Sequence, residues 1–193
     1  MTSCSQGPHP TLRTEITLGQ GSTIRNTITD GRIKDSVDIE IDLHCVADGL
    51  WLGGYQSALD PMVLKERGIT HVVNCIADDF QAYHDGITYL NIYGLYDHGR
   101  VPIRDLFDEV TDFIHGAIHA RGQVLVHCQA GRSRSATLAA AYLIRYKHMT
   151  DEEAIRCLTL KRDCVDPNLG FVFALNAYYT SLQQQQTQTA SAE

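Results

Sequence analysis

Apolar and polar residues follow two different periodicities along most of this 193-residue chain. Short apolar runs, several of them rich in β-branched residues, predict buried strands at residues 50–52, 70–75, 87–93 and 123–126. Apolar positions at helical spacing and runs of good helix formers predict helices at residues 57–66, 103–119, 135–144, 151–161 and 167–182. Because strands and helices alternate, the expected fold class is α/β, with a central, mostly parallel sheet flanked by helices.

Capping signals support the last two helices. Thr150 and Glu153 form a capping box ahead of the first. Asp166 predicts the N-cap of the second, and Pro167 its first helical position. The glutamine-rich segment 184–193 is of low complexity, so we expect it to be disordered.

The first 43 residues differ in character from the rest. Residues 1–11 are polar and predict a loose tail, and residues 16–33 carry isolated apolar side chains between glycine-containing turn signals. From Val37 to Leu43 apolar and polar residues alternate strictly, which is typical of a half-buried strand. The N-terminal extension 1–43 therefore either adds a β-segment to the sheet edge or is mostly disordered up to the first strand of a domain at 44–183.

The net charge and the cysteine content limit which partners and which cellular compartment we expect. A net charge of −7 argues against nucleic acid as a general partner, because no basic surplus neutralises phosphates. The six cysteines show no disulfide framework and no secretory signal precedes them, so we expect reduced thiols in a cytoplasmic or nuclear protein. The longest apolar run, residues 138–144, is too short to span a bilayer, and no membrane anchor is expected.

The run His-Cys-Gln-Ala-Gly-Arg-Ser-Arg-Ser at residues 127–135 joins a predicted strand to a predicted helix. In so tight a turn, successive backbone N–H groups point inward and form an anion-binding nest, which the helix dipole reinforces. The helix N-terminus and an adjacent cation favour the nucleophilic thiolate of Cys128. Arg134 presents a planar fork that holds two phosphate oxygens. An isolated cysteine is commonly just a buried apolar residue, but five fixed residues at this spacing are not expected by chance.

Each residue of this run has an expected role. Cys128 is the nucleophile, Ser135 donates a hydrogen bond to the departing sulfur, and His127 organises the backbone. The residues expected to bind the phosphate are Gln129, Ala130, Gly131, Arg132, Ser133 and Arg134.

Phosphoryl transfer to Cys128 leaves an alkoxide or phenolate that must be protonated. Asp97 lies between a predicted strand and a predicted helix, on a loop whose two glycines suit a moving segment, so it is the expected general acid. Asp105 and Asp108 are weaker candidates, because they fall on the exposed face of the following helix.

A pair of histidines and one further cysteine each have a structural interpretation as well as a functional one. His115 and His119 have the spacing of a helical metal-ligand pair, but no Cys-x-x-Cys accompanies them, so no metal and no cofactor are expected. Cys75 ends a predicted strand and is either a buried structural cysteine or a partner for Cys128 in a protective disulfide.

The pattern His-Cys-x-x-Gly-x-x-Arg-Ser resembles the signature of cysteine-dependent protein phosphatases, and residues 129–137 resemble its dual-specificity branch. Residues 48–53, 68–74 and 167–171 are similar to runs in small, atypical dual-specificity phosphatases. The resemblance covers residues 44–183 and implies the cysteine phosphatase fold. It also implies a metal-independent phosphatase acting on phosphotyrosine and phosphoserine or phosphothreonine of proteins through a cysteinyl-phosphate. Mitogen-activated protein kinases are candidate substrates.

The resemblance further implies that four arginines face one mouth: Arg100, Arg132, Arg134 and Arg162. Three alternatives stay open. The same chemistry could serve a phosphoinositide, a phosphoglucan or an RNA 5′-triphosphate. The pocket could bind phosphate without turnover, or the cysteine loop could transfer sulfur as in rhodaneses.

Overall fold

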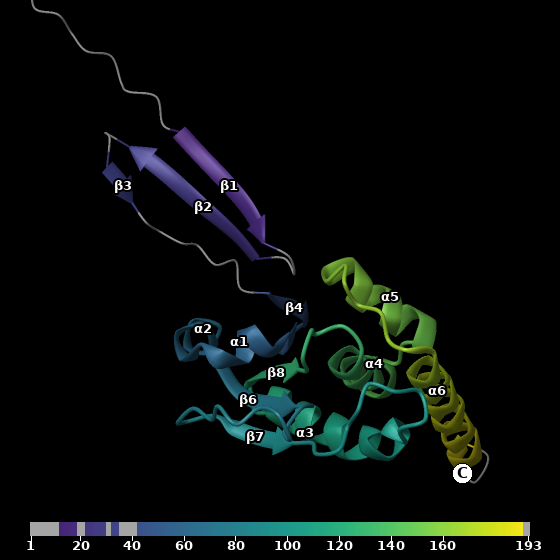
Figure 1. Ribbon diagram of the computed structural model, residues 1–193. Helices are drawn as coiled ribbons and strands as arrows, with labels where there is room; N and C mark the ends of the chain where they lie inside the picture. Colours follow the sequence, from purple (N-terminus) through teal and green to yellow (C-terminus); the bar gives the residue numbers. More distant parts are fainter. Residues whose placement is uncertain (1–11, 19–21, 30–31, 35–41, 191–193) are drawn as a thin grey trace, which may run out of the picture. The chain divides into compact units, whose positions relative to one another are not determined.

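The computed structural model describes residues 12–18, 22–29, 32–34 and 42–190 (Figure 1). The chain divides into two compact units, residues 1–42 and 43–193. In the first, β1 (Leu12–Leu18), β2 (Ser22–Thr29) and β3 (Arg32–Lys34) form an antiparallel three-stranded sheet of their own. Most of the predicted strand Val37–Leu43 lies outside the described residues; Leu43 itself begins the next strand.

The second unit contains a five-stranded sheet of order β4-β5-β8-β6-β7. The strands are β4 (Leu43–Ala47), β5 (Leu50–Gly53), β6 (Ile69–Asn74), β7 (Thr88–Asn91) and β8 (Gln123–His127). All pairings are parallel except that of β4 with β5. The predicted central, mostly parallel sheet is therefore confirmed.

Six α-helices and one short 3₁₀ helix accompany this sheet. They are α1 (Tyr55–Leu59), α2 (Pro61–Glu66), the 3₁₀ helix η1 (Ile103–Leu106), α3 (Phe107–His119), α4 (Arg134–Lys147), α5 (Asp151–Lys161) and α6 (Leu169–Ala190). α3 and α4 pack on β8 and on each other, while α5 and α6 pack on α4. None of these helices combines the length and apolarity of a membrane span.

β8 is the central strand, and it positions the site. Its residues Val124, Leu125 and Val126 are all fully buried, as expected for a parallel strand covered on both faces. Its last residue, His127, is level with Gly53 at the end of β5 and with Asn74 at the end of β6. The segment that follows β8 therefore leaves the sheet at the edge where three parallel strands end.

The predicted helix at residues 57–66 is wrong in its continuity, because Asp60 interrupts it. Pro61 disfavours a helical backbone at the residue before it. The Asp60 carboxylate instead accepts hydrogen bonds from the N–H groups of Met62 (2.8 Å) and Val63 (3.4 Å) and caps α2. The segment is therefore two short helices.

The capping box before α5 is confirmed. The Thr150 hydroxyl accepts from the Glu153 N–H at 3.1 Å, and the Glu153 carboxylate accepts from the Thr150 N–H at 2.9 Å. The expected cap of the last helix is wrong. Asn168, not Asp166, accepts from the Phe171 N–H (3.1 Å), and α6 begins at Leu169.

The predicted disorder of segment 184–193 is also wrong as far as Ala190, because α6 continues through the glutamine run. Glutamine is a good helix former. The last turns extend a helix that is already nucleated, so each further residue adds a hydrogen bond at little entropic cost.

Candidate active site

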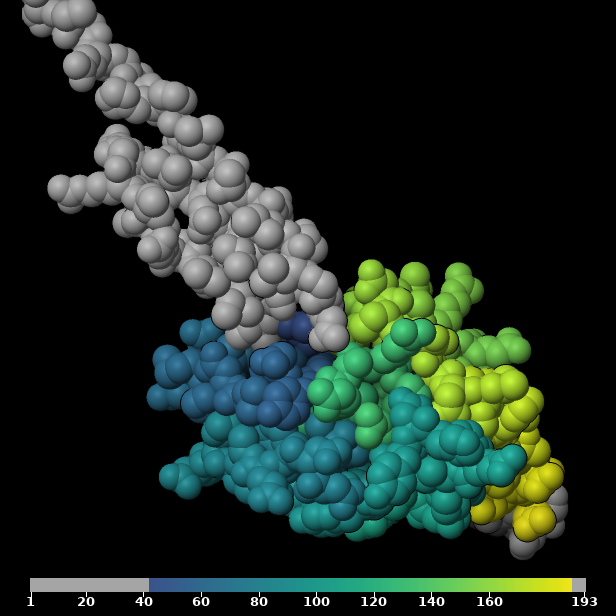
Figure 2. All heavy atoms as spheres, viewed as in Figure 1, coloured from purple at the N-terminus to yellow at the C-terminus, as the bar shows by residue number. Residues whose placement is uncertain are grey.

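The cysteine loop, residues 127–135, is the turn between β8 and α4. Gly131 at its centre has φ +62°, in the left-handed region that favours glycine. A Cβ at this position would lie 2.6 Å from the carbonyl carbon and oxygen of Gly53. The Tyr55 N–H donates to the Gln129 carbonyl at 3.0 Å. The loop is therefore held tightly against the end of β5 and the start of α1. Figure 2 shows its green atoms at the surface, between blue and teal parts of the chain.

Cys128 is at the base of this loop and is 2% exposed. The Ser135 hydroxyl donates to its sulfur at 3.1 Å, so the hydrogen bond expected from the sequence is present. A donor to sulfur stabilises a thiolate, and so does the N-terminus of α4.

Cys75 is a second buried thiol near Cys128, and both thiols are free. Burial, and to a lesser degree the charge of Cys128, raises the pKa of Cys75 well above its usual range. The opposing effect of Arg134 is smaller. Cys75 is therefore a neutral thiol, while a disulfide between the two cysteines stays a prediction.

Arg134 is the first residue of α4, and its side chain is 15% exposed. One terminal nitrogen donates to the Leu95 carbonyl at 3.2 Å. The buried Nε has no hydrogen-bond acceptor among the described residues; the nearest carboxylate oxygen, of Asp97, is 3.8 Å away. Arg134 thus keeps a buried donor without a hydrogen-bond partner among the described residues.

Asp97 lies on the acid loop, residues 94–100. Its Oδ1 accepts from the Ser133 hydroxyl at 2.7 Å and from the Asn168 amide at 2.8 Å. The backbones of Gly99 and Gly170 touch, so a Cβ on Gly170 would collide with the Gly99 carbonyl. The structure therefore brings Asp97 to the cysteine loop and fixes the acid loop on the start of α6.

Asn168 is a site residue that the sequence analysis missed. Its amide holds Asp97, while its own side-chain oxygen caps α6. It stands in the run 167–171 that carries the family resemblance, but nothing in that run pairs it with a residue 71 positions earlier. Only the folded arrangement reveals this role.

The other two carboxylates are not at the site. Asp108 accepts from the Tyr178 hydroxyl at 2.8 Å and from Arg145 at 3.1 Å, and so links α3, α4 and α6. Asp105 is exposed on the 3₁₀ helix.

The expected mouth of four arginines is wrong for Arg162. This side chain is 1% exposed and donates from Nε to the Gly131 carbonyl at 2.9 Å, so it is buried against the loop's backbone. Arg132 is exposed and pairs with Asp166, and Arg100 is exposed on the acid loop. Only Arg134 combines burial with an unused donor.

His127 is fully buried and packs edge-on against the Phe80 ring, with centroids 4.8 Å apart. Burial lowers its pKa to about 4, an effect that its interaction with the Cys128 backbone partly opposes. His127 is therefore neutral at physiological pH.

This burial predicts a pH-dependent stability. Unfolded histidine titrates near pH 6.5, so the unfolded chain binds the extra proton between about pH 6.5 and 4. The free energy of unfolding is therefore highest above pH 6.5 and falls by about 3 kcal/mol in total as the pH is lowered.

We expect His127→Asn to reduce this loss of unfolding free energy, as measured by urea unfolding at pH 7 and 4.5. His148→Asn, at an exposed left-handed position that asparagine tolerates, is the control; an equal loss in both variants would contradict the assignment.

The histidines considered as metal ligands are engaged in stacking. The rings of His115 and His119 stack at 5.9 Å, and His115 stacks on Tyr146 at 3.9 Å. Within the described part of the chain, no group of three His, Cys, Asp or Glu side chains is arranged to hold a metal ion.

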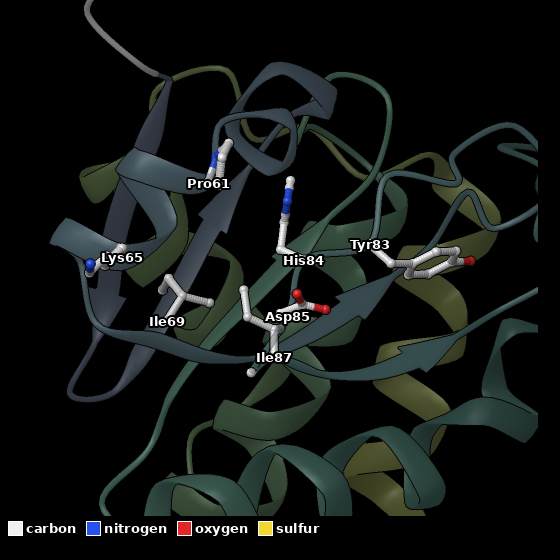
Figure 3. Close-up of a pocket in the computed structure, with 8 residues that line it drawn as sticks. Pro61, Lys65, Ile69, Tyr83, His84, Asp85 and Ile87 are labelled. Atoms are coloured by element: carbon white, nitrogen blue, oxygen red, sulfur yellow. The ribbon is translucent and has the colours of Figure 1, made fainter.

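Two of the cavities on the described part of the second unit differ in their distance from the cysteine loop. One, of about 600 Å³, adjoins the site and is lined by Asp97, Arg132, Ser133, Asp166, Pro167, Asn168, Leu169 and Val172. The other, of about 640 Å³, lies between α2 and the amino ends of β6 and β7, with His84 and Asp85 on its wall (Figure 3). Cys128 follows the carboxyl end of β8, so only the first cavity can receive a group attached to a phosphate at the cysteine loop.

Comparisons with known proteins agree with this geometry. The family model described as "Dual specificity phosphatase, catalytic domain" matches residues 50–181. Dual specificity protein phosphatase 14 of Mus musculus is 35% identical over 161 residues, 83% of this chain and 80% of that protein. The crystal structure of human DUSP28 superposes with a TM-score of 0.70 at 28% identity, covering 74% of this chain and 95% of that one.

One relative is much longer than this chain. MAP kinase phosphatase with leucine-rich repeats protein 3 of Dictyostelium discoideum is 35% identical over 137 residues. The match covers 71% of this chain but only 16% of that protein. The similarity is therefore confined to a small part of that protein.

Proposed function

Since this chain belongs to the dual-specificity protein phosphatase family, as a small atypical member, we propose that it hydrolyses phosphotyrosine and phosphoserine or phosphothreonine on proteins through a cysteinyl-phosphate. One observation carries the proposal. In the turn between β8 and α4, the Ser135 hydroxyl donates to the sulfur of Cys128, beside an Arg134 whose buried Nε has no acceptor among the described residues.

In the first step, the Cys128 thiolate attacks phosphorus, an S–P bond forms and the P–O bond to the substrate breaks. The leaving oxygen takes a proton from Asp97. Arg134 and the backbone N–H groups of the loop stabilise charge on the phosphoryl oxygens, and a preorganised set of donors does this without rearrangement during the reaction. The fork of Arg134 also matches two of these oxygens in geometry.

In the second step, Asp97 is a carboxylate and accepts a proton from the attacking water. The new P–O bond forms as the S–P bond breaks, and phosphate leaves. The sulfur regains its negative charge, which the Ser135 hydroxyl stabilises by its hydrogen bond. Asp97 is protonated again, so the cycle closes without a metal.

The surroundings of the site support a protein substrate. The adjoining cavity begins at Asp97 and continues along the start of α6, where Leu169 and Phe173 are 67% and 65% exposed. An apolar side chain next to a phosphorylated residue has surface to contact here. Relatives named as MAP kinase phosphatases make mitogen-activated protein kinases candidate substrates.

Phosphate release from matched substrates tests the proposal. The panel consists of phosphotyrosine and phosphothreonine peptides, a phosphoinositide, a phosphoglucan and an RNA 5′-triphosphate. We expect kcat/KM to be highest for the peptides. A higher value for any of the other three would assign the same chemistry to a non-protein phosphate, and release from none would leave a phosphate-binding protein.

Asp97→Asn tests the acid. The amide cannot donate a proton to the leaving oxygen, so alkyl phosphates should slow by about 10²-fold to 10⁴-fold. Aryl phosphates with good leaving groups need little protonation and should slow far less. The loss of rate with rising pH, which a general acid imposes, should also disappear from the pH profile of kcat/KM.

The control for this variant is Asp105→Asn, because Asp105 is exposed on the neighbouring 3₁₀ helix. It should leave both substrate classes unchanged. An equal loss on alkyl and aryl substrates in Asp97→Asn would mean that Asp97 is structural, and that the acid lies elsewhere.

A further inference from the structure

Arg162 is the largest of the fully buried side chains, although it carries a charged group. It caps the C-terminal end of α5, and its guanidinium reaches the cysteine loop. Nε donates to the Gly131 carbonyl and Nη2 to the Ala130 carbonyl, each at 2.9 Å, and Nη1 is 3.0 Å from Nδ1 of His44. A buried cation is costly unless it is hydrogen-bonded, so these contacts account for its place in the fold.

The two carbonyls determine where two N–H groups point. A peptide unit is planar, and in the trans form its C=O and N–H point in opposite directions; the described residues contain no cis peptide bond. The Ala130 carbonyl shares its peptide unit with the N–H of Gly131, and the Gly131 carbonyl shares its unit with the N–H of Arg132. A guanidinium that holds both carbonyls therefore directs both N–H groups to the opposite side, away from Arg162.

We propose that Arg162 is a positioning residue of the phosphate site, which fixes the N–H groups of Gly131 and Arg132 toward the anion by holding the carbonyls behind them. The inference rests on the proposed function, which assigns the phosphate to this loop. The charge of Arg162 adds to the effect, since a cation at the carbonyl end polarises each peptide unit and strengthens its N–H as a donor.

The guanidinium of Arg162 occupies the space that a side chain at Gly131 would need. A Cβ at Gly131 would lie 2.7 Å from Nη2 of Arg162. The glycine is thus needed for its backbone angle and also for room, because a side chain there would push the guanidinium off the two carbonyls.

Binding of inorganic phosphate to the purified full-length chain tests this role, with Arg162→Lys and Arg162→Met as variants. Lysine keeps the charge but lacks the rigid planar fork whose Nε and Nη2 hold the two carbonyls in a fixed geometry. We expect the Kd for phosphate, measured calorimetrically, to rise by about 10-fold to 100-fold in Arg162→Lys. The rate of Cys128 alkylation by the anion iodoacetate should fall relative to that by neutral iodoacetamide. Arg162→Met should lose at least as much if it folds.

Arg145→Lys is the matched control. Arg145 also uses two nitrogens, Nη1 on Asp108 and Thr111 and Nη2 on Asp112, and these contacts lie outside the loop. It should keep the phosphate Kd of the unsubstituted protein. A folded Arg162→Lys variant with a lower Tm but an unchanged Kd and alkylation ratio would reduce Arg162 to a structural residue and overturn the inference.

Phosphate binding requires no turnover, which separates the two proposals. An unsubstituted protein that binds phosphate but hydrolyses no substrate would refute the proposed function. The effect of Arg162→Lys on the Kd would still decide whether Arg162 positions the nest.

Discussion

Replacing Cys128 by serine is expected to abolish turnover and to leave a folded protein that still binds phosphate. A serine hydroxyl is not ionised by the field of the loop, so the nucleophile is lost, while Arg134 and the N–H nest remain. We expect kcat to fall by roughly 10⁴-fold to 10⁶-fold. The phosphate Kd should not rise, because the neutral hydroxyl removes the negative charge of the thiolate beside the anion while Arg134 stays in place.

Cys157→Ser provides the control, since Cys157 lies on α5 away from the loop and is only half-buried. It should keep full activity. Turnover by Cys128→Ser at a rate close to that of the unsubstituted protein would rule out a cysteinyl-phosphate. Capture of a ³²P-labelled phosphoenzyme by acid quench from the active protein, but not from Cys128→Ser, would locate the covalent step.

Arg134→Lys should also be severe, with kcat/KM lower by about 10²-fold to 10³-fold. The ammonium of lysine keeps the charge but cannot match two phosphoryl oxygens at once. It also cannot serve the anion and the Leu95 carbonyl together, as the arginine fork can. The acid loop should therefore lose one of its attachments in the same variant.

The phosphate Kd and the kinetics are both informative for Arg134→Lys. We expect both to worsen, whereas Arg145→Lys, the same change on the same helix, should alter neither. A loss confined to Tm, with kcat/KM preserved, would show that Arg134 merely packs the start of α4.

Several of the features predicted correctly from the sequence depend on neighbouring residues. Thr150 and Glu153 form their capping box because both partners lie within one helical turn. The cysteine loop is equally local, and so Gly131 and the Ser135 hydrogen bond to Cys128 are as expected. The parallel sheet also follows from the alternation of strands and helices along the chain.

Two of the features that were wrong or missed depend on contacts between distant segments. Arg162 lies 31 residues from Gly131 in sequence, and nothing around it signals that it becomes buried beneath a loop. Asn168 acquires its role through Asp97, which lies on a different loop. The glutamine run is helical to Ala190 because α6 already precedes it, whereas its composition alone is typical of disorder.

The contact between Gly99 and Gly170 limits which amino-acid changes can accumulate near this site. Two backbones that touch leave no room for a side chain on Gly170, so even the smallest replacement by mutation would lift the acid loop off α6. Variation among descendants of this sequence is therefore expected to spare Gly170 and to collect on exposed residues such as Tyr96, which is 67% exposed on the acid loop. The position of Asp97 relative to the cysteine loop is therefore expected to stay constant among such descendants, while the exposed surface of the acid loop can vary.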